Sequence, residues 1–78
     1  MNRYFFDLHN GSGIVPDEEG RALPTRESVE AEVGRILTDV ARDELPDHAL
    51  GVATVVVRDD SGGTICVGSL SFSKSWLS

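Results

Sequence analysis

The stretch from Thr25 to Leu45 reads TRESVEAEVGRILTDVARDEL, and it predicts the helix around which the rest of the chain is arranged. Its apolar residues recur at steps of one, three and four, which returns them to the same side of a helix. Thr25 is suited to cap the N-terminus and Pro46 disfavours helical geometry at Leu45, so we expect a helix over residues 26–45. Gly34 interrupts it, and either a close contact with a sheet or chance would account for that glycine. The apolar side comprises Val29, Val33, Ile36, Leu37, Val40, Ala41 and Leu45.

The segments on either side of this helix predict the sheet against which its apolar side would lie. Residues 3–8 are rich in aromatic side chains, residues 52–58 include three consecutive valines, and turn sequences containing Asn, Asp and Gly follow both. We therefore predict a single α+β domain over residues 1–78 in the order β-β-α-β-β, with the amphipathic helix on one face of a four-stranded, mainly antiparallel sheet. The expected strands are 3–8, 14–16, 52–58 and 64–72, followed by a tail at 73–78, while Arg21–Leu23 is assigned to a connecting segment. In the last strand, alternation places Cys66, Gly68, Leu70 and Phe72 toward the helix.

Composition excludes several classes of function. The 78 residues carry a formal net charge of −6, which argues against nucleic-acid binding because phosphate contacts need clustered Lys and Arg. The single cysteine cannot form an internal disulfide, and the N-terminus lacks the apolar core of a signal peptide. No apolar run approaches the roughly 20 residues that span a bilayer. We expect a cytoplasmic protein that does not associate with membranes.

The residues that usually carry chemistry do not form a recognisable set. His9 and His48 fall in predicted loops, and Cys66 falls in a strand that should be buried, so we expect no metal site. The acidic turns do not have the spacing of a calcium loop, and the glycine-rich turns lack the lysine of a phosphate loop. We find no candidate catalytic residue and no cofactor site, and we expect that the protein is not an enzyme.

The sheet leaves an apolar surface without a cover. A single helix covers one face only, yet alternation places apolar residues on the other face too. We predict a protein-interaction or self-association module, as a homo-oligomer or with another protein, acting through this face or an edge strand. In the alternative, the C-terminal tail folds over the face, because an exposed tryptophan forgoes about 1.5–3 kcal/mol of burial. The candidate surface comprises Phe5, Val56, Ile65, Val67 and Trp76.

Several short motifs together resemble a known family. In combination they are similar to small bacterial proteins, grouped only as a domain of unknown function, that open with Arg-Tyr-Phe-Phe-Asp. The resemblance implies a cytosolic stand-alone domain and brings no known activity, cofactor or catalytic residue. The chain departs from the family at Thr25, where an aspartate cap is common, and in its Gly- and Ser-rich final strand. The motifs are Arg3-Tyr4-Phe5-Phe6-Asp7, Gly11 and Gly13, Asp17-Glu18-Glu19-Gly20, Leu23-Pro24, Ala41-Arg42-Asp43-Glu44-Leu45-Pro46, and the Val-x-Val-Arg-Asp strand end at Val55 to Asp59.

A second functional hypothesis follows from the negative charge. The chain has a looser likeness to HicB-type antitoxins, which also have an N-terminal strand, an acidic turn, a Leu-Pro step and an amphipathic helix, although no DNA-binding segment follows here. In this alternative the protein is an acidic inhibitor that neutralises a basic partner. The acidic docking surface would comprise Asp17, Glu18, Glu19, Asp59 and Asp60.

Overall fold

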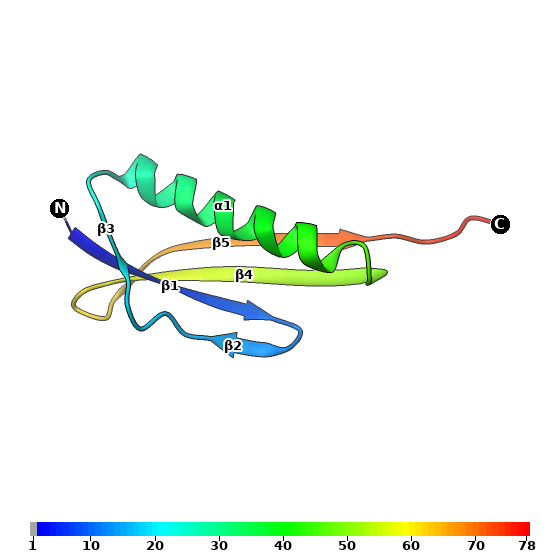
Figure 1. Ribbon diagram of the computed structural model, residues 1–78, viewed down its shortest axis with the longest axis horizontal. Coiled ribbons are helices and arrows are strands. Elements are labelled where there is room, and N and C mark those ends of the chain that lie inside the picture. The colour runs from blue at the N-terminus through cyan, green and yellow to red at the C-terminus, as the bar shows by residue number, and fades with distance from the viewer. Residues whose placement is uncertain (1) are drawn as a thin grey trace.

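In the computed structural model, which describes residues 2–78, one helix lies on one face of an antiparallel sheet of five strands (Figure 1). The predicted α+β architecture is confirmed, and the order of elements is β-β-β-α-β-β. The helix α1 spans Arg26–Glu44. The strands are β1 (Asn2–Asn10), β2 (Gly13–Val15), β3 (Arg21–Leu23), β4 (Leu50–Asp59) and β5 (Thr64–Ser73).

The sheet has one strand more than the sequence predicted. The segment Arg21–Leu23, expected to be a connection, forms β3 and pairs with Asn2–Tyr4 of β1, whereas β2 pairs with Leu8–Asn10 at the other end of the same strand. Three residues are too few to display an alternating pattern, and β3, unlike the equally short β2, is not joined to its partner β1 by an Asn-Gly turn that would indicate a hairpin. The opposite edge of β1 holds β4, and β4 in turn holds β5, so the order is β2-β1-β4-β5.

The helix begins at a capping box. Thr25 Oγ1 accepts a hydrogen bond from the Ser28 amide at 3.1 Å, and Ser28 Oγ accepts one from the Thr25 amide at 3.1 Å. The apolar side of α1 lies on β4 and β5, as its spacing predicted. Among the residues described, six hydrophobic side chains are buried, so this core is small even for a short domain. They are Phe6, Val29, Val33, Ala53, Val55 and Val57.

The helix packs closely against β5 at Gly68. A Cβ atom added at Gly68 would lie 2.4 Å from Val33 Cγ1, so only glycine lets α1 settle at this distance. At Gly34 of α1, by contrast, an added Cβ would meet nothing within 4 Å. A close contact therefore does not account for Gly34. It does account for Gly68, whose lack of a side chain makes room for the helix.

The molecule is long and thin for its mass. Its principal extents are 52 × 23 × 17 Å and its radius of gyration is 14.0 Å, whereas a compact chain of this length has a radius near 11.5 Å. Its accessible surface is 5453 Å², against roughly 4,600 Å² for a typical folded monomer of this mass. The described residues contain no helix that is both long and apolar enough to cross a membrane.

Candidate interaction surfaces

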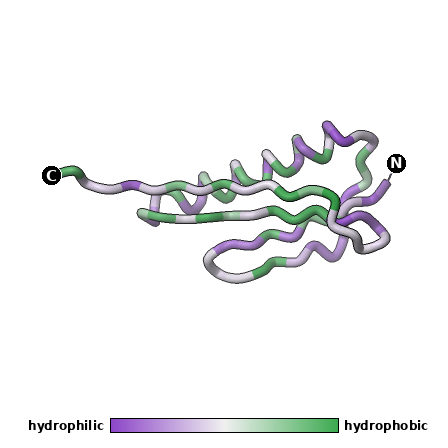
Figure 2. The backbone as a smooth tube through the Cα atoms, turned by 180° about the vertical axis from the view of Figure 1, so that it is seen from behind, coloured by the Kyte–Doolittle hydropathy of each residue, from purple (hydrophilic) through white to green (hydrophobic). Residues whose placement is uncertain are grey.

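The face of the sheet opposite α1 is here called the open face. It carries exposed valines on the inner strand β4 and on the edge strand β5. Ala53, Val55 and Val57 of β4 point into the core, so the residues between them point the other way. Val52 of β4 is 59% exposed and Val67 of β5 is 58% exposed, while Val56 lies half-buried between neighbouring strands. Figure 2, seen from behind, shows hydrophobic positions recurring along β4 and β5. Val56 and Val67 pair directly on the open face, as the alternation predicted, and the hydrogen-bonded side chains of Thr54 and Ser69 separate them from Val52.

Ile65 departs from the expected alternation. The pairing of β4 with β5 runs from Val57 opposite Cys66 directly to Arg58 opposite Thr64, which leaves Ile65 without a partner at a register irregularity. Such a bulge re-aims a side chain. Ile65 is 44% exposed and lines a shallow depression with Tyr4, Val29 and other residues near the start of α1. It therefore lies beside the helix rather than on the open face.

Phe5 lies on the open face but is covered there. The guanidinium carbon of Arg58 sits 5.1 Å from the centre of the Phe5 ring, within reach of a cation–π interaction. On another side the turn at Gly20 closes over the ring, since a Cβ added at Gly20 would lie 2.8 Å from Phe5 Cε2. Gly20 also has a φ of +72°, which favours glycine. Phe5 is half-buried as a result, and the expectation that it is uncovered is wrong.

A polar network fixes the chain segment between β2 and β3 to the open face. Arg58 Nε donates to Asp7 Oδ2 at 2.6 Å and Nη2 donates to Asp7 Oδ1 at 3.1 Å, a two-pronged ion pair across β1 and β4. The amide of Asp17 donates to Asp7 Oδ1 at 2.9 Å, and the Asp17 carbonyl accepts from Arg58 at 3.2 Å. We did not predict this network. The sequence does place opposite charges, Asp7 and Arg58, at open-face positions of two strands. Whether they meet depends on the register between β1 and β4, which could not be predicted from the sequence.

The pKa values of both aspartates are lowered in this network. Hydrogen bonding from Arg58 holds the pKa of Asp7 below its ordinary 3.8, although burial acts in the opposite direction. Burial also tends to raise the pKa of Asp17, but the amides of Gly20, Phe6 and Glu19 donate to its carboxylate and together lower it. Both carboxylates are therefore charged at neutral pH and engaged in holding the fold.

The predicted acidic docking surface is divided in the structure. Asp17 belongs to the network just described, and Asp59 accepts bonds from the Ser61 hydroxyl and the Gly63 amide, which lower its pKa and close the hairpin between β4 and β5. The side chains of Glu18, Glu19 and Asp60 are exposed in the same two turns. Three of the five acids thus remain at the surface, and two are used to build the turns.

The C-terminal tail points away from the body of the molecule (Figure 1). Trp76 is 95% exposed and Leu77 is 97% exposed, so the expected burial of Trp76 is wrong for the single chain, and the tail does not fold over the open face. The amide of Lys74 still donates to the Ala49 carbonyl at 2.7 Å, and its ammonium group donates to the Leu45 carbonyl. The pairing between the last strand and its neighbour therefore continues to Lys74.

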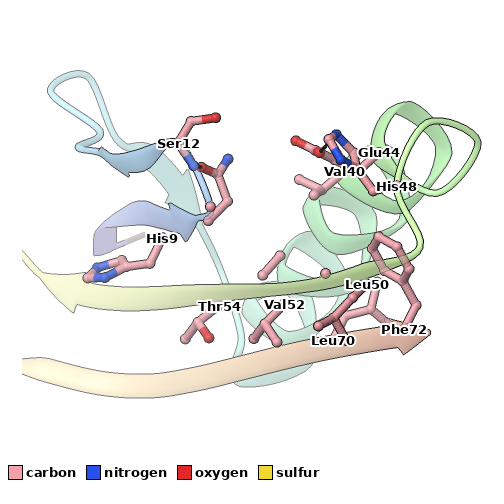
Figure 3. A pocket seen from close by; sticks show the side chains of 14 residues that line it. His9, Ser12, Val40, Glu44, His48, Leu50, Val52, Thr54, Leu70 and Phe72 are labelled. Atoms are coloured by element: carbon pink, nitrogen blue, oxygen red, sulfur yellow. Dashed lines mark hydrogen bonds and ion pairs between the residues drawn. The ribbon is translucent and has the colours of Figure 1, made fainter.

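A hollow of about 560 Å³ opens where β4 extends past the end of β1 (Figure 3). The pairing of β1 with β4 stops at His9 opposite Thr54, and the C-terminal end of α1 forms the opposite wall. His9 lies in β1, not in a loop as predicted, and it lines the hollow together with His48, whose Nε2 is 3.1 Å from Glu44 Oε2. Among the residues described, no three His, Cys, Asp or Glu side chains are grouped so that they could hold a metal ion. The hollow is otherwise lined mainly by apolar and small residues.

Comparison with known proteins identifies a family without an assigned function. The sequence model of the family described as "Domain of unknown function (DUF6894)" matches residues 3–71. The chain belongs to this family, and the resemblance seen in its motifs is confirmed. No curated protein and no solved structure matches the chain. These findings do not show the looser likeness to HicB-type antitoxins.

Proposed function

We propose that this member of the family is a non-enzymatic protein-interaction module that associates through apolar surface on its sheet. The observation that carries the proposal is the amount of apolar surface left in water by a chain with only six buried hydrophobic residues among those described. Val52, Val67 and Trp76 are each more than half exposed. Apolar side chains exposed in this way are available for contact with a partner protein.

The way the chain uses its charged groups supports a non-enzymatic role. Perturbed pKa values often mark catalytic groups, but here each shift belongs to a structural contact. Asp7 and Arg58 join two strands, Asp59 closes a hairpin, and Glu32 bonds Arg35 along the surface of α1. None of these groups faces the hollow beside His9 and His48.

Sedimentation velocity over a wide range of protein concentration tests the proposal. Association through apolar surface should persist when salt is raised to about 1 M, where the Debye length falls to about 3 Å. A chain that remains monomeric at every concentration and binds no protein partner would contradict it. If the only complex formed is with a basic protein and it dissociates in high salt, the acidic-inhibitor alternative is favoured instead.

A further inference from the structure

Beyond the bulge at Ile65, the outer edge of β5 is a long strand edge without charged residues or proline to protect it against pairing. The strand Thr64–Ser73 reads TICVGSLSFS and contains neither a charged residue nor a proline. Soluble proteins usually guard such edges with Lys, Pro or very short strands, because exposed N–H and C=O groups recruit other strands. The opposite edge of the sheet shows this protection: β2 and β3 have three residues each, and the segment between them holds Pro16 and three consecutive acids.

We propose that the free edge of β5 pairs antiparallel with β5 of a second copy, giving a two-fold dimer with one continuous sheet. This inference rests on the proposed function. It specifies a second copy of the chain as the partner and β5 as the strand that binds it. A second copy supplies a strand of matching length and equally uncharged composition, and a two-fold axis makes the contact self-complementary.

The hydrogen bonds already made by β5 determine which groups remain for a partner. The Lys74 amide faces β4, where it donates to Ala49. Since successive residues of a strand point their N–H and C=O groups to opposite sides, the groups of Val67, Ser69, Ser71 and Ser73 face outward. These four residues are therefore available for the hydrogen bonds of the new pairing.

Symmetry then limits the register. A two-fold axis perpendicular to the sheet must pass beside one residue, which pairs with its own copy, and this keeps both helices on the same side. We place the axis beside Ser69, so that Val67 of each copy pairs with Ser71 of the other. Lys74 of each copy then lies opposite Thr64 of the other, next to the acidic hairpin that contains Asp60. The tail with the exposed Trp76 continues across the same hairpin.

Two substitutions separate edge pairing from stacking of the open faces. Ser71→Pro removes an outward N–H group without removing a bond to β4, and should weaken dimerisation at least tenfold, with Ser71→Ala as its matched control. Val52→Glu adds a charge to the open face, one strand inward from the edge, and should leave the dimer intact. A dimer that survives Ser71→Pro but is lost in Val52→Glu would overturn edge pairing and leave the proposed function standing. Edge pairing would also be overturned if both variants lose the dimer or if both keep it. It would likewise be overturned if the unsubstituted protein is a monomer. Circular dichroism confirms that each variant is folded.

Cysteine cross-linking tests the register directly. In a Cys66→Ser background, Ser69→Cys should give a disulfide-linked dimer under mild oxidation, because paired residues lie within disulfide distance. Ser73→Cys in the same background should stay unlinked, since antiparallel pairing separates its two copies by eight residues along the strands. Cross-linking at position 73 and not at 69 would overturn the register.

Discussion

The substitution Gly68→Ala tests whether the helix packs against β5 as closely as the structure shows. The added methyl carbon would lie 2.4 Å from Val33 Cγ1 and 3.6 Å from Leu37 Cδ1. Ordinary carbon contacts begin near 3.5 Å, so the helix and strand must separate by about 1 Å or Val33 must leave its place. Val33 is only 6% exposed and has core neighbours on its other sides. Overpacking of this kind costs about 1–3 kcal/mol, a large part of the stability of so small a domain.

Gly34→Ala is the matched control, because it makes the same chemical change on the outer side of the helix. An added Cβ there meets nothing within 4 Å, and alanine is favoured over glycine in a helix by about 1 kcal/mol. Urea unfolding followed by far-ultraviolet circular dichroism, at one fixed protein concentration, measures both free energies. Trp76 fluorescence is unsuitable because that side chain is exposed in the folded chain. The two variants should shift the unfolding midpoint in opposite directions.

A double-mutant cycle identifies the contact responsible. Val33→Ala removes the methyl group that Gly68→Ala would meet, so the double variant should be more stable than the sum of the two single effects predicts. If Gly68→Ala is as stable as the parent protein, or if its cost is the same with and without Val33→Ala, the close packing of α1 on β5 is refuted.

Three further outcomes follow from single contacts. Gly20→Ala should destabilise the fold by about 1–3 kcal/mol, since Gly20 has a positive φ and an added Cβ would lie 2.9 Å from the Tyr4 carbonyl. Gly11→Ala is the control in thermal melts, because a Cβ added at Gly11 meets nothing within 4 Å. Equal melting temperatures of the Gly20→Ala and Gly11→Ala variants would contradict the strain expected at Gly20. The folded pKa of Asp7 is lowered, so its contribution to stability is present above pH 3.8 and is lost as the pH falls through its folded value. Asp7→Asn should flatten the acid limb of a stability–pH curve, and an unchanged limb would exclude this role. Thr25→Ala should cost about 1 kcal/mol through loss of the N-cap, and an unchanged urea midpoint would show that the capping box contributes nothing.

The periodic segments of the sequence were enough to predict the architecture. The apolar steps of α1 identified Val29 and Val33, and alternation correctly assigned Gly68 to the helix side, where it meets Val33. The strand β3 was missed because three residues carry no period, and they pair only because β1 is already in place. The equally short β2 was predicted because the Asn-Gly turn before it indicates a hairpin with β1.

The parts of the candidate surface that were wrong depend on contacts between distant segments. Phe5 is covered by Arg58 and Gly20, and Ile65 is redirected by a bulge, and neither effect is visible in a two-residue alternation. The burial expected for Trp76 came from its apolar area alone. The apolar area of a side chain indicates how much free energy its burial would contribute. It does not indicate which surface would cover the side chain. In the single chain no neighbour covers Trp76.

The motifs that mark the family meet at one place in the fold. Asp7 ends the first motif, Asp17 and Gly20 belong to the acidic one, and Arg58 lies in the strand-end motif; together they hold the segment between β2 and β3 against the sheet. These residues therefore form a structural scaffold. The strand β5, to which we assign the pairing edge, lies outside this network. We therefore expect that placing a lysine at Ser69 keeps the helix content measured by circular dichroism while abolishing the dimer, because two like charges would then meet at the axis. Loss of the fold in that variant would show that β5 belongs to the scaffold and is not an independent pairing edge.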